Sequence, residues 1–150
     1  MYEETLVILK PDALERSLVG IIIDRYERAG LKVLDIRYYK KVNTSLMIKH
    51  YPDSMAGELG KKAQLVYPEI TDTLTHGMKV LDRLRNYFTR NPVIAIKFNG
   101  NNAIAVVRKV TGYTDPATAD KGTIRGDLGI DSIAKSTTEE RACENLIHAS

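Results

Sequence analysis

The sequence predicts a single domain in which helices cover a β-sheet, and three observations support this. Its 150 residues match the usual length of one domain. Apolar residues make up 43% of the chain, as expected for an ordinary globular core. Strand-like segments alternate with segments of helical periodicity. Four strands in this order fit a ferredoxin-like α+β sandwich, although the order alone leaves a small doubly wound sheet open.

The first third of the chain predicts a strand, a helix and a second strand. Residues 5–9 are apolar on both faces, and Pro11 ends this strand because it has no N–H to donate. Ser17 is the expected N-cap of a helix that ends at Gly30. The apolar stripe of this helix consists of Val19, Ile22, Ile23 and Tyr26. Residues 34–38 alternate apolar and polar side chains, which predicts a strand with one polar face.

The middle of the chain is less regular. A short helix is expected over residues 44–51. Residues 52–78 mix glycine and proline with apolar side chains and show no clear period. Apolar residues at helical spacing follow over residues 81–88. Pro92 then opens a strand whose alternate residues, up to Phe98, are apolar.

The last third predicts a helix over residues 103–111, which Gly112 ends. Residues 113–122 are expected to form a loop, because Asp-Pro within them is typical of turns. A final strand is expected over residues 123–128. A capping-box pattern predicts a short helix over residues 137–144.

Composition argues against several classes of protein. The 22 basic and 19 acidic residues give a net charge of +3 and are spread along the chain, so nucleic-acid binding is not indicated. The single cysteine, Cys143, excludes an internal disulfide and a cysteine-rich zinc site, and it fits a reducing compartment. No apolar run reaches membrane-spanning length, and the acidic start is unlike a secretory signal. We therefore expect a cytoplasmic protein without a membrane segment.

The sequence contains no phosphate-binding P-loop, no Gly-x-Gly-x-x-Gly and no His-Glu-x-x-His. Its candidate residues are scattered instead. Lys10 follows a buried strand, where a lysine can act as a point charge for phosphate. Arg125 lies between two glycines, and its guanidinium suits bidentate phosphate contact. His148 can act as a nucleophile, since a neutral imidazole nitrogen attacks phosphorus without a separate base.

Each of these residues also has a plainer interpretation. Lys10 is equally compatible with a solvated strand end, and Arg125 with a surface pair to Asp127. Arg108 follows Val107 on a helix, so its stem can cover apolar surface instead of reaching a cleft. These alternatives remain open when each residue is taken alone.

Taken in order, a set of short segments resembles the nucleoside diphosphate kinase family. The segments are Glu4–Ala13, Leu18–Gly20, His50–Tyr51, Asn91–Val93, Arg108–Gly112, Thr114–Pro116, Gly122–Asp127 and Asn145–Ser150. The specificity lies in their order and approximate spacing. The resemblance implies a ferredoxin-like core and a transferase that moves the γ-phosphate of ATP or another nucleoside triphosphate to a nucleoside diphosphate. It also implies a ping-pong mechanism through a phosphohistidine.

The resemblance implies a role for each matched position. His148 would be the nucleophile, with Tyr51 bonding to the phosphate or positioning the site beside it. Asn145 would bind the ribose and terminal phosphate region. The residues implied to contact the nucleotide are Lys10, Leu81, Arg108, Thr114, Arg125 and Asn145. Mg²⁺ would be held by the nucleotide phosphates, with no metal ligand from the protein. The family also implies a homo-oligomer, either a tetramer or a hexamer.

The chain departs from the family pattern in three ways, one being that the sequence stops at Ser150, where members are expected to continue into a helix whose glutamate orients the histidine. Leu81 stands where members usually stack a phenylalanine on the base, so we expect weaker nucleotide binding and a lower KM for Leu81→Phe. Insertions are expected near residues 52–78 and 129–142 of a single domain spanning 1–150. Two other functions stay open: a non-catalytic nucleotide- or protein-binding module, and a nucleic-acid-binding sheet with few aromatic residues to stack on bases.

Overall fold

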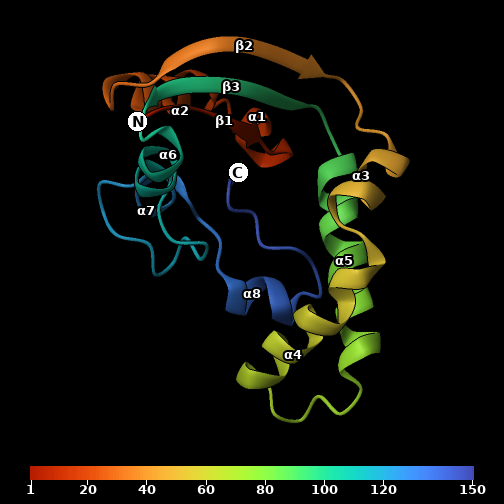
Figure 1. Ribbon diagram of the computed structural model, residues 1–150. Coiled ribbons are helices and arrows are strands. Elements are labelled where there is room, and N and C mark those ends of the chain that lie inside the picture. The colour runs from red at the N-terminus through yellow and green to blue at the C-terminus, as the bar shows by residue number, and fades with distance from the viewer.

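The computed structural model describes residues 1–150 as a four-stranded antiparallel sheet with helices packed against one face and at one end (Figure 1). The strands are β1 (Tyr2–Leu9), β2 (Lys32–Tyr39), β3 (Val93–Asn101) and β4 (Ile147–Ala149). The helices are α1 (Pro11–Glu15), α2 (Val19–Arg28), α3 (Thr44–His50), the 3₁₀ turn η1 (Asp53–Met55), α4 (Ala56–Val66), α5 (Thr73–Thr89), α6 (Ala103–Thr111), α7 (Ile124–Leu128) and α8 (Ile133–Thr138). The spatial order of the strands is β2-β3-β1-β4. This confirms the ferredoxin-like α+β fold over the doubly wound alternative, because every strand pair is antiparallel.

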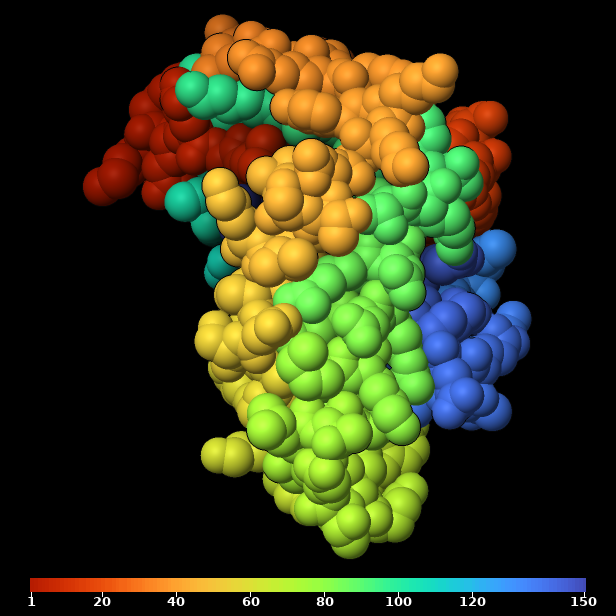
Figure 2. Space-filling view, turned by 90° about the vertical axis from the view of Figure 1, so that its right-hand side faces the viewer, coloured from red at the N-terminus to blue at the C-terminus, as the bar shows by residue number.

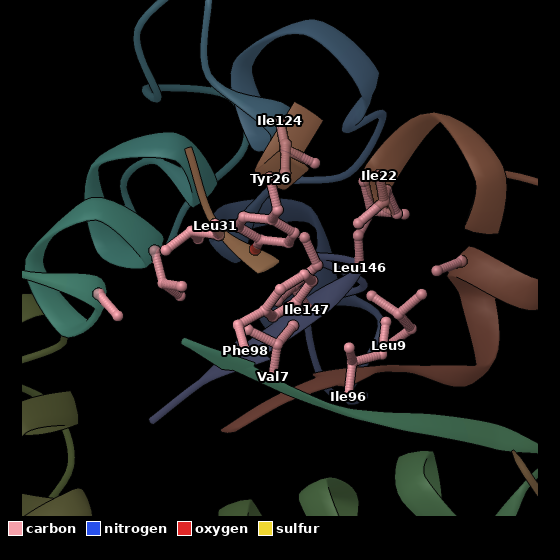
Figure 3. Close-up of a cluster of buried hydrophobic side chains, with 13 residues drawn as sticks. Val7, Leu9, Ile22, Tyr26, Leu31, Ile96, Phe98, Ile124, Leu146 and Ile147 are labelled. Atoms are coloured by element: carbon pink, nitrogen blue, oxygen red, sulfur yellow. The ribbon is translucent and has the colours of Figure 1, made fainter. Parts of the chain in front are cut away.

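The main core lies between the sheet and helices α2 and α6. Its 13 buried residues include Tyr26 of α2 and Phe98 of β3, whose ring centroids are 5.1 Å apart. Figure 3 shows these two rings among aliphatic side chains from β1, β3 and the C-terminal segment. Segments far apart in the sequence therefore share one apolar core, which anchors the end of β1 and the short β4 next to each other.

A second cluster lies where β2 ends and β3 begins, and it ties α3, α4 and α5 to the sheet. Helices α4 and α5 form an antiparallel hairpin that extends away from the sheet, with residues 129–145 beside it (Figure 2). The two helices are close because glycines face main chain: a Cβ on Gly60 would overlap the Thr73 carbonyl, and one on Gly77 the Ala56 carbonyl. The expected insertion at 52–78 thus corresponds to η1, α4 and the beginning of α5.

Most predicted elements are present, with corrections at three places. Ser17 does not cap α2, because it has a left-handed φ of 57° and Leu18 is the N-cap. The predicted strand over 123–128 is wrong. The Thr123 hydroxyl accepts the N–H of Gly126, which starts helix α7 instead.

The fourth strand is β4, and its three residues pair with β1. The predicted helix over 137–144 is also shifted, since Ser132 caps α8 and Glu140 leaves the helix with a φ of 55°. No helix of this structure combines the length and hydropathy needed to cross a membrane.

The predicted strand over 34–38 is present within β2, but its apolar side chains are not buried. Leu34, Ile36 and Tyr38 are 46%, 49% and 61% exposed. The reason is position: β2 pairs only with β3, so it forms one edge of the sheet.

Candidate active site

The ends of β1 and β4 bring Lys10, Asn145 and His148 together. His148 lies opposite Ile8 in the antiparallel pairing of β4 with β1. The Lys10 amide donates to the Leu146 carbonyl at 2.8 Å, and its ammonium donates to Asn145 Oδ1 at 2.9 Å. Residues 135 positions apart in sequence are thereby held in one polar cluster.

Lys10 is a buried cation with few partners. It is 5% exposed, and its Nζ lies 5.2 Å and 5.4 Å from the ring centroids of Tyr87 and Phe88. Burial and the nearby Arg125 guanidinium lower the pKa of Lys10 to about 8. A buried ammonium without a carboxylate in hydrogen-bond contact is costly, and an anionic ligand would offset that cost.

His148 is held in the neutral form. Its side chain is half-buried, and desolvation is the main cause that lowers its pKa to about 4. The neighbouring His50, Lys10 and Arg125 lower it further. Since the imidazole is neutral near pH 7, one ring nitrogen keeps a free electron pair for attack on an electrophile.

An aromatic group surrounds His148 on the side of the second cluster. The ring of His50 meets the ring of His148 edge-on, with centroids 4.7 Å apart. Tyr51 lies against His50 at 4.5 Å, and Phe88 lies 6.5 Å from His148. The rings exclude water from one side of His148, which explains much of its desolvation.

Tyr51 itself is fixed by helix α5. Arg85 donates through Nε and Nη2 to the Tyr51 carbonyl, at 3.1 Å and 2.5 Å, and through Nη2 to Asp53 at 2.7 Å. Burial raises the pKa of the Tyr51 hydroxyl to about 12, so this group stays protonated and can donate a hydrogen bond.

Arg125 lies in the site but on a helix, and its first role is to hold the main chain. Its guanidinium donates to the carbonyls of Asn145 at 3.0 Å, Gly112 at 3.1 Å and Ile147 at 2.6 Å. A guanidinium has five N–H donors, so two remain for another acceptor. The surface pair with Asp127 is not formed, because Asp127 pairs with Arg25.

Arg108 and Thr114 are both exposed. Arg108 makes no ion pair or side-chain hydrogen bond in this structure, which leaves its guanidinium free. Thr114 is tied to the site through its carbonyl, which accepts from Asn145 Nδ2 at 3.1 Å.

Leu81 does not lie in this site, contrary to the expectation from the sequence that it contacts the nucleobase. Its side chain is 0% exposed within the second cluster, so it packs in the core and offers no surface to a nucleobase. Sequence spacing identified the helix correctly but not the face on which Leu81 lies.

A cavity of about 620 Å³ lies on the outer face of the sheet and meets the aromatic group only through His50 and Phe88. No group of three His, Cys, Asp or Glu side chains in this structure is arranged to hold a metal ion. The carboxylate nearest the site, Asp12, already accepts from the hydroxyl of Tyr87 and from the amide of Leu146.

Four residues of this site carried no signal of their own role in the sequence: Asp12, His50, Arg85 and Tyr87. Asp12 and His50 lie inside segments that resemble family motifs, which is the one clue that was available for them. Arg85 and Tyr87 occupy helical positions that read as ordinary surface and core. Only the packing of α5 against α1 and α3 reveals their contacts.

Comparisons with known proteins agree with this geometry. The family model described as nucleoside diphosphate kinase matches residues 3–150. A curated nucleoside diphosphate kinase from Pyrobaculum aerophilum is 39% identical over 99% of this chain and 87% of its own length. The crystal structure of an NDP kinase from Pyrobaculum aerophilum superimposes with a TM-score of 0.91 at 36% identity, covering all of this chain and 88% of that one. The enzyme from Borrelia burgdorferi, solved as a transition state mimic with vanadate and ADP, gives a TM-score of 0.80 at 33% identity, covering 99% of this chain and 79% of that one.

Proposed function

We propose that this chain, a phosphotransferase that belongs to the nucleoside diphosphate kinase family, transfers a γ-phosphate between nucleotides through a phosphohistidine at His148. One observation carries the proposal. The half-buried His148, whose pKa is lowered to about 4 by burial and by nearby cations, lies beside the buried ammonium of Lys10 and the guanidinium of Arg125. Such a site combines an uncharged nucleophile with fixed positive charge.

The reaction divides into two half-reactions. In the first, a ring nitrogen of His148 attacks the γ-phosphorus, the N–P bond forms, and the bond to the β-phosphate oxygen breaks to release the nucleoside diphosphate. In the second, a terminal phosphate oxygen of the acceptor diphosphate attacks, and the N–P bond breaks. Phosphoryl transfer depends on in-line positioning and charge neutralisation, and Lys10 and the two remaining N–H donors of Arg125 would supply the positive charge.

Three further groups, exposed on Arg108 and Thr114 and buried on Asn145, would bind the rest of the nucleotide. Arg108 offers an unpaired guanidinium, Thr114 a hydroxyl, and Asn145 an amide that contacts both Lys10 and Thr114. Because Leu81 is buried, we do not retain it as a base contact. Since Asp12 is committed to protein donors, Mg²⁺ would be held by the nucleotide phosphates, whose charge it would neutralise.

A phosphoenzyme assay tests the proposal. The protein is incubated with Mg²⁺ and γ-labelled ATP, and the label should survive alkali, be lost in acid, and pass to added GDP or CDP. His148→Ala should abolish labelling while ADP still binds. The matched control is His76→Ala, on α5 outside the site, which should label like the wild type. Label that persists in His148→Ala would place the nucleophile elsewhere, and binding without label in the wild type would favour a non-catalytic nucleotide-binding module.

We also propose a homo-oligomer in which a second copy covers β2. The support is the free edge of this strand together with its exposed Leu34, Ile36 and Tyr38. Sedimentation at several concentrations should show a dimer, tetramer or hexamer. Ile36→Lys should shift it toward monomer, whereas Leu65→Lys, an equally drastic change at an 85% exposed leucine of α4, should not. The reverse result would move the interface to α4. A cytoplasmic location stays a proposal, supported by the free Cys143.

A further inference from the structure

The turn that precedes His148 is held in an unfavourable backbone conformation. Leu146 has a φ of 71°, in the left-handed region that leucine rarely adopts. Its side chain is 0% exposed and packs in the main core, so the turn cannot relax without opening that core. A conformation of this kind persists only when the surrounding contacts over-determine it, and it is found where a functional group must be aimed.

Hydrogen bonds fix this turn from several directions. The Leu146 amide donates to Asp12 Oδ2 at 3.1 Å, and its carbonyl accepts from the Lys10 amide at 2.8 Å. The carbonyls of Asn145 and Ile147, on either side, accept from Arg125. The Asp12 contact is the only one of these that uses a carboxylate, so the position of Leu146 depends on the orientation of that side chain.

Asp12 is oriented in turn by Tyr87 of helix α5. Asp12 is 2% exposed, and its second oxygen, Oδ1, accepts the hydroxyl of Tyr87, which is 5% exposed. Burial and the adjacent carboxylate raise the pKa of Tyr87, so its hydroxyl keeps the proton that it donates. The Tyr87 ring is also held, because Lys10 Nζ lies 5.2 Å and the Arg90 guanidinium carbon 5.3 Å from its centroid.

We propose that Tyr87 and Asp12 are positioning residues for His148: the Tyr87 hydroxyl orients the Asp12 carboxylate, which holds Leu146 left-handed and so aims the imidazole two residues later. Neither side chain bonds to His148 or needs to touch the nucleotide. The chain of contacts links α5, whose Arg85 also holds Tyr51, through Asp12 to the backbone of Leu146, two residues before the nucleophile. The inference rests on His148 being the residue that is phosphorylated.

Tyr87→Phe tests this with the loss of one oxygen atom. The rate constant for phosphorylation of His148 at saturating Mg²⁺ and ATP should fall at least about tenfold, because small misalignments of reacting groups are costly. The dissociation constant of ADP should stay within about twofold, because no nucleotide-binding group is removed. The matched control is Tyr26→Phe, which removes a hydroxyl that is also buried and also bonded, to Thr111, in the main core. It should lose stability but keep the wild-type rate per folded molecule.

The outcomes separate the two proposals. Equal rates per folded molecule in the wild type and Tyr87→Phe would overturn the positioning role and leave the phosphohistidine intact. A wild type that takes no label at His148 would overturn the proposed function itself. If Tyr87→Phe does not fold, Asp12→Asn tests the same link from its other end, and there an unchanged rate would likewise overturn it. Faster hydrogen exchange at the Leu146 amide of the variant, with the Ile22 amide of α2 unchanged, would support it without any activity measurement.

Discussion

His148 should make the stability of this protein fall between pH 7 and pH 5, and His148→Asn should remove that contribution. The pKa of His148 is lowered from 6.5 to about 4 in the folded chain, chiefly by burial. A depressed folded-state pKa means that the unfolded chain binds more protons over this window. Stability from this group is therefore fully present above about pH 6.5 and is lost as pH falls toward 4.

The magnitude follows from the two pKa values. Each pKa unit corresponds to about 1.4 kcal/mol, and the linkage between pH 7 and pH 5 amounts to about 2 kcal/mol. Urea denaturation at a fixed protein concentration measures it. The loss of unfolding free energy between these two pH values should be about 2 kcal/mol larger in the wild type than in His148→Asn. Between pH 8 and pH 7 the wild type and His148→Asn should lose nearly the same unfolding free energy, because the imidazole of His148 is mostly neutral there in both the folded and the unfolded chain.

The lowered pKa of His148 also predicts how the rate of phosphorylation depends on pH. The rate of phosphoenzyme formation should stay nearly flat from pH 7 to about pH 5.5, whereas an imidazole with a pKa of 6.5 would be half protonated at pH 6.5 and about nine-tenths protonated at pH 5.5. If the wild type and His148→Asn lose the same stability and the rate halves near pH 6.5, the burial argument for His148 is refuted.

Three further predictions concern α4 and α5. Gly77→Ala should destabilise the fold by about 1–3 kcal/mol, because its Cβ would overlap a carbonyl of the facing helix. Gly57→Ala has open space around its Cβ and should stabilise the fold by about 0.5–1 kcal/mol. Thermal unfolding of the two variants measures both changes. Leu81→Phe should lower the free energy of unfolding by about 1–3 kcal/mol, because the larger ring overpacks the core. It should not lower the KM for nucleotide, contrary to the expectation from the sequence. A fall in KM with unchanged stability would show that this side chain reaches the base. Arg85→Met should lower kcat more than it raises KM, because the Tyr51 carbonyl loses its donors while the nucleotide contacts remain. Steady-state kinetics measure both constants. A change in KM alone would argue against a positioning role for Arg85.

Sequence periodicity was enough to locate the helices and strands that carry their own amphipathic signal. The alternation at residues 34–38 and 92–98 and the stripe around Ile22 and Tyr26 correspond to β2, β3 and α2. Gly30 and Gly112 end helices with φ near 90°, as their positions predicted. These features depend on local chemistry, so a single sequence reveals them.

In the candidate site, too, some residues could be identified from the sequence, whereas their contacts could not. Lys10, Asn145 and His148 were identifiable because each lies in a short segment whose order along the chain resembles a family pattern. Their convergence, however, depends on β4 pairing with β1, and a three-residue strand has too little pattern to be predicted. The predicted strand at 123–128 failed for a related reason: the hydroxyl of Thr123 competes for the backbone and starts a helix there.

The sequence by itself determined through local periodicity that helices and strands alternate, and its motifs of fixed order resembled one family and identified residues able to carry phosphoryl chemistry. The antiparallel strand pairing that selects the ferredoxin-like fold came from the structure. Only the tertiary structure decided which side chains are buried, and burial sets their role. It placed Leu81 in the core, committed three donors of Arg125 to main-chain carbonyls, and kept His148 neutral. It also joined Tyr87 to Asp12, 75 positions away. Contacts at such separations depend on how the helices pack against the sheet, and no local pattern in the chain encodes that packing.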